Sequence, residues 1–153
     1  MSPAITTKLP ANLLGYLAEG CLAILATRDE AGWPHLVMTW VVARDERTVR
    51  FIADHNTTTS SNLERDNRAS LQIIGPENIL FLIKGFSQHV RDRVAAASFA
   101  MMMMEMAVTE VKDQSWPIVE VSPLAYIWLS DKKNELAAME QAVFAELHEW
   151  EAE

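Results

Sequence analysis

Three strand-like runs that follow one another closely constrain the fold of this chain most. Apolar and β-branched residues fill 22–27, 35–43 and 48–54, and only short polar segments, such as Asp29 to Gly32, join them. A crossover between parallel strands needs about a dozen residues or more, so these links permit only antiparallel neighbours. The sequence therefore predicts an antiparallel meander and argues against a doubly wound parallel sheet.

The remaining patterns predict three further strands and four helices. Helices are expected over 9–19, 58–66, 95–109 and 131–150, and strands over 69–74, 78–91 and 117–129. Gly85 falls inside the longest of these strands, where glycine favours a bulge or a bend. The fold class predicted is mainly β with helical decorations, a six-stranded antiparallel barrel in a single domain over 1–153.

The last helix carries an apolar stripe and should be packed rather than free in solvent. The stripe consists of Leu136, Met139, Val143, Leu147 and Trp150. On an isolated helix it would expose a continuous apolar band. We expect the chain's own barrel to receive it, because short connections usually pack on their neighbours, and a second subunit is the alternative.

Composition excludes several classes of function. The net charge of −8 repels nucleic acids and anionic membranes. The lone Cys21 excludes an internal disulfide, and the four histidines lack metal-ligand spacing, so no metal is expected. No apolar run approaches the ~20 residues of a spanning helix, and the first residues do not resemble a signal peptide, so we expect a cytoplasmic protein. No nucleophile and base pair is evident, so the catalytic residues are unknown.

Five consecutive hydroxyl residues, Thr57 to Ser61, stand at the start of the helix expected over 58–66. Unpaired N–H groups and the helix dipole favour an anion such as phosphate at this position. The alternative is that Asn56 or Thr57 only caps the helix, since one such residue suffices for a cap. Both interpretations stay open at the level of the residues.

Several aromatic and polar residues also admit two interpretations. Trp116 and Trp128 fit either a ligand cover at a dimer interface or buried structural positions. His55 fits an exposed turn better than a ligand contact, and the methionine run 101–104 fits core packing better than an adaptable pocket.

A set of motifs in the region 10–92 resembles a known family. The motifs are Glu19 to Thr27, Gly32, Pro34 to Val37, Thr39-Trp40, Thr59, Asn62-Leu63, Arg65-Asp66 and Phe81 to Gly85. They resemble the FMN-binding split barrels, which include pyridoxamine 5′-phosphate oxidase-like proteins and small FMN-binding proteins of anaerobic bacteria. Beyond this region, only Ser122 to Trp128 is similar to the closing strand of that family.

The resemblance implies a split barrel that forms a homodimer, with one FMN at each end of the interface. The second strand would lie along the flavin ring, and the loop after the third strand would hold the phosphate. The residues that border the ring or the ribityl chain would be Met38, Thr39 and Trp40. Those around the phosphate would be Asp54, Thr57, Thr58, Thr59 and Asn62.

The chain departs from the family in its basic residues. Thr58 stands where a lysine is common, and residues 35–42 contain no Arg or Lys. Other basic side chains would have to reach the phosphate, the candidates being Arg28, Arg50, Arg65, Arg68 and Lys84. The basic residues that serve a phosphorylated substrate have no counterpart near the C-terminus. The function that the resemblance implies is a flavin-dependent oxidoreductase acting on a small molecule; the alternatives are a non-enzymatic FMN-binding or electron-transfer module and a barrel that has lost flavin.

Overall fold

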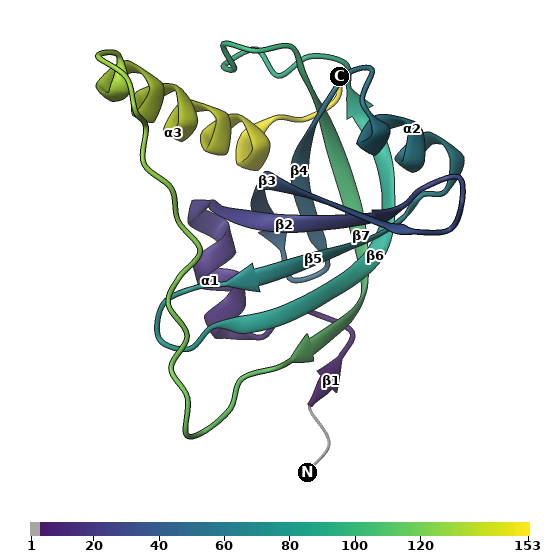
Figure 1. Ribbon diagram of the computed structural model, residues 1–153, viewed down its shortest axis with the longest axis vertical. Coiled ribbons are helices and arrows are strands. Elements are labelled where there is room, and N and C mark those ends of the chain that lie inside the picture. Colours follow the sequence, from purple (N-terminus) through teal and green to yellow (C-terminus); the bar gives the residue numbers. More distant parts are fainter. Residues whose placement is uncertain (1–3) are drawn as a thin grey trace.

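The structure, a computed structural model that describes residues 4–153, is built around a closed antiparallel barrel (Figure 1). The strands are β1 (Ile5–Thr6), β2 (Cys21–Arg28), β3 (Pro34–Asp45), β4 (Thr48–Asp54), β5 (Arg68–Ile74), β6 (Leu80–Arg91) and β7 (Met101–Asp113). The helices are α1 (Ala11–Glu19), α2 (Thr58–Arg65) and α3 (Lys133–Glu149). Strands pair in the order β7-β4-β3-β2-β5-β6, and β6 returns to β7. The predicted six-stranded barrel is confirmed, with β1 added outside it on β7.

Alternation along the strands builds the barrel interior. In β2, Cys21, Ala23 and Leu25 are buried while their neighbours are partly exposed, as expected for a strand with one face on the core. Helix α1 packs beside β3, and its Leu13 and Leu17 are fully buried in the same apolar cluster. Burial raises the pKa of the Cys21 thiol to about 12, so this cysteine is a core residue rather than a reactive one.

The predicted irregularity at Gly85 is present. The pairing of β6 with β7 shifts register between Lys84 and Gly85. A Cβ atom at Gly85 would lie 2.2 Å from the carbonyl oxygen of Ala107 on β7. Glycine therefore lets the two strands approach closely where the longest ladder of the barrel bends.

The prediction of a helix over 95–109 is wrong, because residues 101–113 form the strand β7. This strand lies between β4 and β6 and is covered on both faces over its first half. Met102 and Met104 face the barrel interior, whereas Met103 belongs to a second apolar cluster outside it. A strand buried on both faces is a continuous apolar run, which helical propensity alone cannot distinguish from a buried helix.

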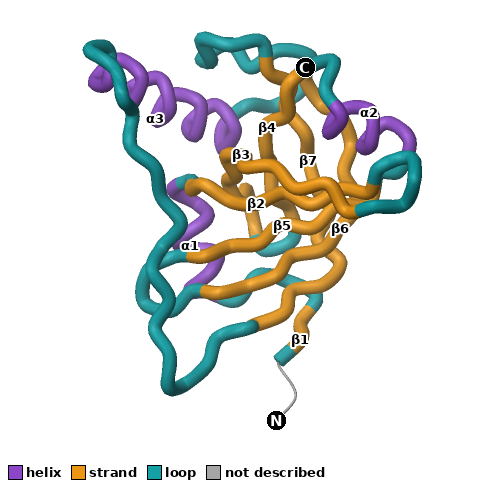
Figure 2. Tube along the Cα trace, viewed as in Figure 1, coloured by secondary structure: helices purple, strands orange, loops and turns teal. Residues whose placement is uncertain are grey.

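The strand expected over 117–129 is also wrong. The segment after β7 runs without regular structure past α1 to the start of α3 (Figure 2). Because β6 already pairs with β7, the barrel offers this segment no free edge. It is held instead by single contacts, such as the N–H of Leu124 donating to the carbonyl of Ile74, and its prolines supply no donors.

Helix α3 packs on the chain's own barrel. Val143 and Leu147 are fully buried, and the cluster around them includes Trp40, Ile52 and Met103 from three strands. Phe144, which the stripe did not include, is 7% exposed. Within residues 4–153, no helix is long and apolar enough to cross a membrane.

The buried Arg50 of β4 fastens the C-terminal end of α3. Its Nε donates to Glu105 at 2.8 Å, and its Nη1 donates to the carbonyl oxygens of Leu147 and Trp150. Its guanidinium also lies 5.4 Å from the centre of the Trp150 ring. A single cation thereby satisfies carbonyl groups that every helix leaves open at its end.

Candidate functional site

The main cavity, of about 510 Å³, lies where β3 and β4 separate. Its lining comprises Leu22, His35, Val37, Met38, Thr39, Trp40, Ile52, Ala53, Asp54, Thr57, Thr58, Thr59, Met101 and Tyr126. The ladder between β3 and β4 ends at Val41 and Phe51, so the preceding part of β3 pairs only with β2. Backbone N–H and C=O groups on the side of β3 that faces β4 are left available to a ligand. The volume suits a ligand of cofactor size.

The β3 wall of the main cavity combines open and fixed side chains. Met38 is 65% exposed and forms a surface that a flat ring can cover. Thr39 is buried, and its hydroxyl donates to the carbonyl oxygen of Ile52 at 2.7 Å, which bridges the gap between β3 and β4. Thr39 therefore supports the wall with its side chain and offers a ligand mainly its backbone.

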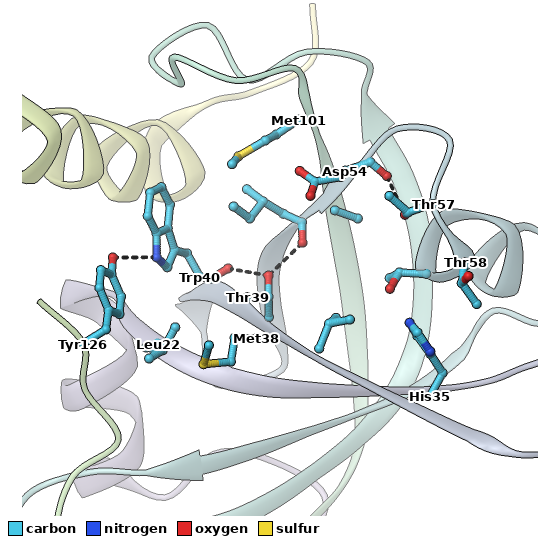
Figure 3. Close-up of a pocket in the computed structure, with 14 residues that line it drawn as sticks. Leu22, His35, Met38, Thr39, Trp40, Asp54, Thr57, Thr58, Met101 and Tyr126 are labelled. Atoms are coloured by element: carbon cyan, nitrogen blue, oxygen red, sulfur yellow. Dashed lines mark hydrogen bonds between the residues drawn. The ribbon is translucent and has the colours of Figure 1, made fainter. Parts of the chain in front are cut away.

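Trp40 closes one end of the main cavity. Its ring makes edge contacts with Phe144, at a centroid distance of 5.9 Å, and with Trp128, at 6.3 Å. Its Nε1 donates to the hydroxyl oxygen of Tyr126 at 3.0 Å. Figure 3 shows Trp40 and Tyr126 at this end, with Thr57, Thr58 and His35 at the opposite end.

The start of α2 forms the opposite end and divides the hydroxyl run between two tasks. Thr57 caps the helix: its Oγ1 accepts from the N–H of Ser60 at 3.3 Å, and the Ser60 hydroxyl accepts from the N–H of Thr57 at 2.9 Å. The cap predicted as one alternative is thus present. Thr58 and Thr59 take no part in this pair of capping bonds, and both line the main cavity. The first backbone N–H groups of α2, at this end of the cavity, have no acceptor within the helix.

Asn62 is the one predicted site residue outside the lining. It is 2% exposed, and its amide donates to the hydroxyl of Thr27 at 3.0 Å and accepts from Arg65 at 3.2 Å. Asn62 therefore holds α2 against β2, behind the end of the main cavity that Thr58 and Thr59 form.

Neither lysine nor arginine lines the main cavity. In the described part of the chain, each basic side chain that was a candidate for a phosphate is engaged elsewhere. Arg50 bonds Glu105, Arg28 and Arg68 bond Asp66, Arg65 bonds Asn62 and the Arg28 carbonyl, and Lys84 lies 3.2 Å from Glu110. Arg68 and Arg28 hold the pKa of Asp66 well below its ordinary range, as expected for a carboxylate in that network.

Besides the phenol of Tyr126, the ionisable groups of the main cavity are His35 and Asp54. A carboxylate at Asp54 repels a dianion, so the hydroxyl groups of Thr58 and Thr59 and the dipole of α2 are the anion-favouring features of this cavity. Within residues 4–153, no cluster of metal-ligating side chains is present. The chemistry of the cavity is that of an apolar slot with hydrogen-bonding groups at both ends.

Sequence reasoning missed the part of the lining that comes from distant segments. Met101 was expected in a helix, and Tyr126 in a strand without a role in the site. Of the two tryptophans left open, Trp128 packs behind Trp40, whereas Trp116 is 65% exposed. His55 is exposed and bonds the carbonyl of Asp92, outside the lining.

A second cavity, of about 480 Å³, lies on the outer face of β2, β5 and β6. Arg28, Arg68 and Lys84 line it, but each of them is paired with Asp66 or Glu110. Its cations are thus already compensated, which makes the main cavity the better candidate site.

Comparison with known proteins supports one family. A sequence profile described as pyridoxamine 5′-phosphate oxidase matches residues 9–126. No curated protein matches the sequence significantly.

Solved structures share the fold. One is a candidate pyridoxamine 5′-phosphate oxidase from Lactobacillus delbrueckii, with a TM-score of 0.60 and 18% identity over 72% of this chain and 98% of that chain. An F420 reductase has a TM-score of 0.60 and 16% identity over 69% of this chain and 100% of that chain. A variant of HupZ from Group A Streptococcus has a TM-score of 0.55 and 15% identity over 67% of this chain and 97% of that chain. At these identities the likeness is one of fold.

Proposed function

The chain belongs to the pyridoxamine 5′-phosphate oxidase family, and from this premise we propose that the main cavity binds FMN. The observation that carries the proposal is the meeting of two features in one cavity of about 510 Å³. The open edge of β3 lies beside an apolar slot, and the start of α2 presents Thr58 and Thr59 at its far end. A flat ring with a phosphate on a flexible chain suits this combination.

The ring would lie over Met38 and the β3 edge, and the phosphate would approach the N–H and hydroxyl groups of Thr58 and Thr59. Asp54 is a hydrogen-bond acceptor and suits the hydroxyl groups of the ribityl chain between them. Bound flavin supplies the redox chemistry, and the chain supplies placement and an apolar environment. On this basis the protein is a flavin-dependent oxidoreductase acting on a small molecule.

A homodimer is part of the proposal. Trp33, Leu36 and Met38 are each more than half exposed at one end of β3, beside the main cavity. A second subunit would cover this apolar surface. Light scattering at micromolar concentration should give about twice the chain mass of 17.2 kDa. A monomeric mass would show that no second subunit contributes to the site. The cytoplasmic location expected from the sequence is part of the same proposal.

The decisive experiment is an absorption spectrum of the purified protein, followed by titration of the flavin-free protein with FMN. Flavin bands in the purified protein, or saturable binding of added FMN, support the proposal. Reduction of the bound flavin by a nicotinamide nucleotide then separates an oxidoreductase from an electron-transfer module. A protein that neither carries nor binds FMN refutes the proposal and favours a barrel that has lost flavin.

A further inference from the structure

We infer that Tyr126 is a ligand-positioning residue, whose hydroxyl donates a hydrogen bond to an acceptor on the ring end of the ligand in the main cavity. The acceptor is a carbonyl oxygen or an unprotonated ring nitrogen. This inference rests on the proposed function and deepens it, because it assigns specificity for the ring to a residue outside the barrel strands.

The first part of the argument is that Tyr126 is held in place. The segment that carries it has no strand pairing, yet its hydroxyl oxygen accepts from Trp40 Nε1 at 3.0 Å (Figure 3). Its ring meets Trp128 edge to face at a centroid distance of 5.4 Å and an angle of 87°. Trp40 is only 7% exposed and contacts Phe144 of α3, so the support of Tyr126 is itself fixed. The tyrosine is therefore preorganised at the cavity wall.

The second part concerns the hydroxyl proton. An indole N–H can only donate, so the Tyr126 oxygen acts as acceptor in its bond with Trp40 and keeps its own hydrogen for another partner. Among residues 4–153, no protein group accepts that hydrogen from Tyr126. Tyr126 is 37% exposed and lines the main cavity. A ligand in the cavity is the partner that the geometry provides.

The third part is the two-ended character of the main cavity. Thr58 and Thr59 offer donors to an anion at one end, and Tyr126 offers a donor to a neutral acceptor at the other. A ligand that has a phosphate but no ring acceptor would leave the tyrosine hydrogen unpaired, at a cost in affinity. The residue thus selects for the chemistry of the ring, independently of the phosphate.

Two ligands and two matched tyrosine variants test this assignment. Tyr126→Phe removes the hydroxyl and keeps the ring, and Tyr16→Phe makes the same change on α1, outside the main cavity. Fluorescence titrations with FMN and with riboflavin, which lacks the phosphate, should show an affinity about two- to ten-fold lower in Tyr126→Phe for both ligands. Tyr16→Phe should match the parent protein.

Spectroscopy separates ligand contact from mere support of Trp40. At saturating FMN, Tyr126→Phe should shift the visible flavin band and make the midpoint potential more negative, because a hydrogen bond that stabilises the electron-rich reduced ring is lost. A purely structural residue would change affinity without moving either quantity.

A measurement on the parent protein needs no variant. The chain has two tyrosines, and burial raises the pKa of Tyr16 to about 12, so nitration should act mainly on Tyr126. Bound FMN should slow the nitration of Tyr126.

The outcomes are distinguishable. If the parent protein does not bind FMN, the proposed function fails first. If it binds FMN, four results would each overturn the assignment: equal affinity and band position in Tyr126→Phe, a lower affinity with unchanged band position and midpoint potential, a loss confined to FMN and absent with riboflavin, or nitration of Tyr126 that FMN does not slow.

Discussion

Replacing Arg50 with methionine should destabilise the protein strongly, because this side chain joins α3 to the barrel. The Arg50 side chain is 4% exposed and donates to Glu105 and to the carbonyl oxygens of Leu147 and Trp150. Methionine keeps much of the apolar stem and removes all three bonds. Breaking a buried ion pair by removing one partner costs about 3–5 kcal/mol.

Partial exposure of the partner sets the expected magnitude. The Glu105 side chain is 26% exposed, so water reaches the stranded carboxylate, and the loss should be near the lower limit, about 3 kcal/mol. In a domain of this size that corresponds to a melting temperature about 6–12 °C lower. Changing Glu105 to methionine as well should recover about 1–2 kcal/mol, since no unpaired charge then remains.

Arg44 provides the matched control. It also bonds the end of α3, through the carbonyl of His148 and the carboxylate of Glu151, but its side chain is 26% exposed. Arg44→Met should therefore cost no more than about 1 kcal/mol. Urea unfolding followed by tryptophan fluorescence measures all of these variants. Equal losses for the Arg44 and Arg50 variants, or a double variant no more stable than Arg50→Met, would refute the reasoning.

Four further predictions concern the cavity and the packing around it. Thr58→Ala with Thr59→Ala should weaken FMN binding by about 1–3 kcal/mol and leave riboflavin binding unchanged, which titration measures; an unchanged FMN affinity would place the anchor elsewhere. Thr58→Lys should raise FMN affinity, with a gain that shrinks as salt is added, and a poorer affinity would contradict a phosphate at that end. Truncation after Ser130 should lower solubility and the melting temperature, whereas an equally stable product would show that α3 is a detachable arm. Gly85→Ala should destabilise the barrel by about 1–3 kcal/mol in urea unfolding, because its Cβ would press on the β7 backbone; a loss below about 0.5 kcal/mol would show that the bulge can adjust.

Local patterns predicted most of the barrel because each of its early elements has a local cause. Short links force β2, β3 and β4 to be antiparallel neighbours, and burial on one face gives β2 its alternation. The same reasoning failed for β7, since a strand covered on both faces loses the alternation that identifies it. The reasoning also failed for residues 117–129, whose composition is typical of a strand. This segment has no strand to pair with, because β6 already pairs with β7.

The part of the candidate site that comes from β3 and the start of α2 could be predicted from the sequence. The residues expected on β3 and at the start of α2 line the main cavity, because they lie within short segments whose order in the barrel is fixed. Tyr126 lies 86 positions from Trp40, and no local signal links the two. The place of Asn62 depends on Thr27, a contact that exists only once α2 has packed on β2.

The division of labour along 57–62 has a consequence for how readily such a protein changes its ligand. Thr57, Ser60 and Asn62 carry the helix cap and the contact with β2, so their replacement costs stability. Thr58, between them, is exposed to the cavity and makes no structural bond that the fold requires, and Met38 has the same freedom on β3. Substitutions at these two positions should therefore change the free energy of unfolding little, while they change the groups that a ligand in the cavity meets. A barrel built this way can drift between ligands during evolution without passing through unstable intermediates.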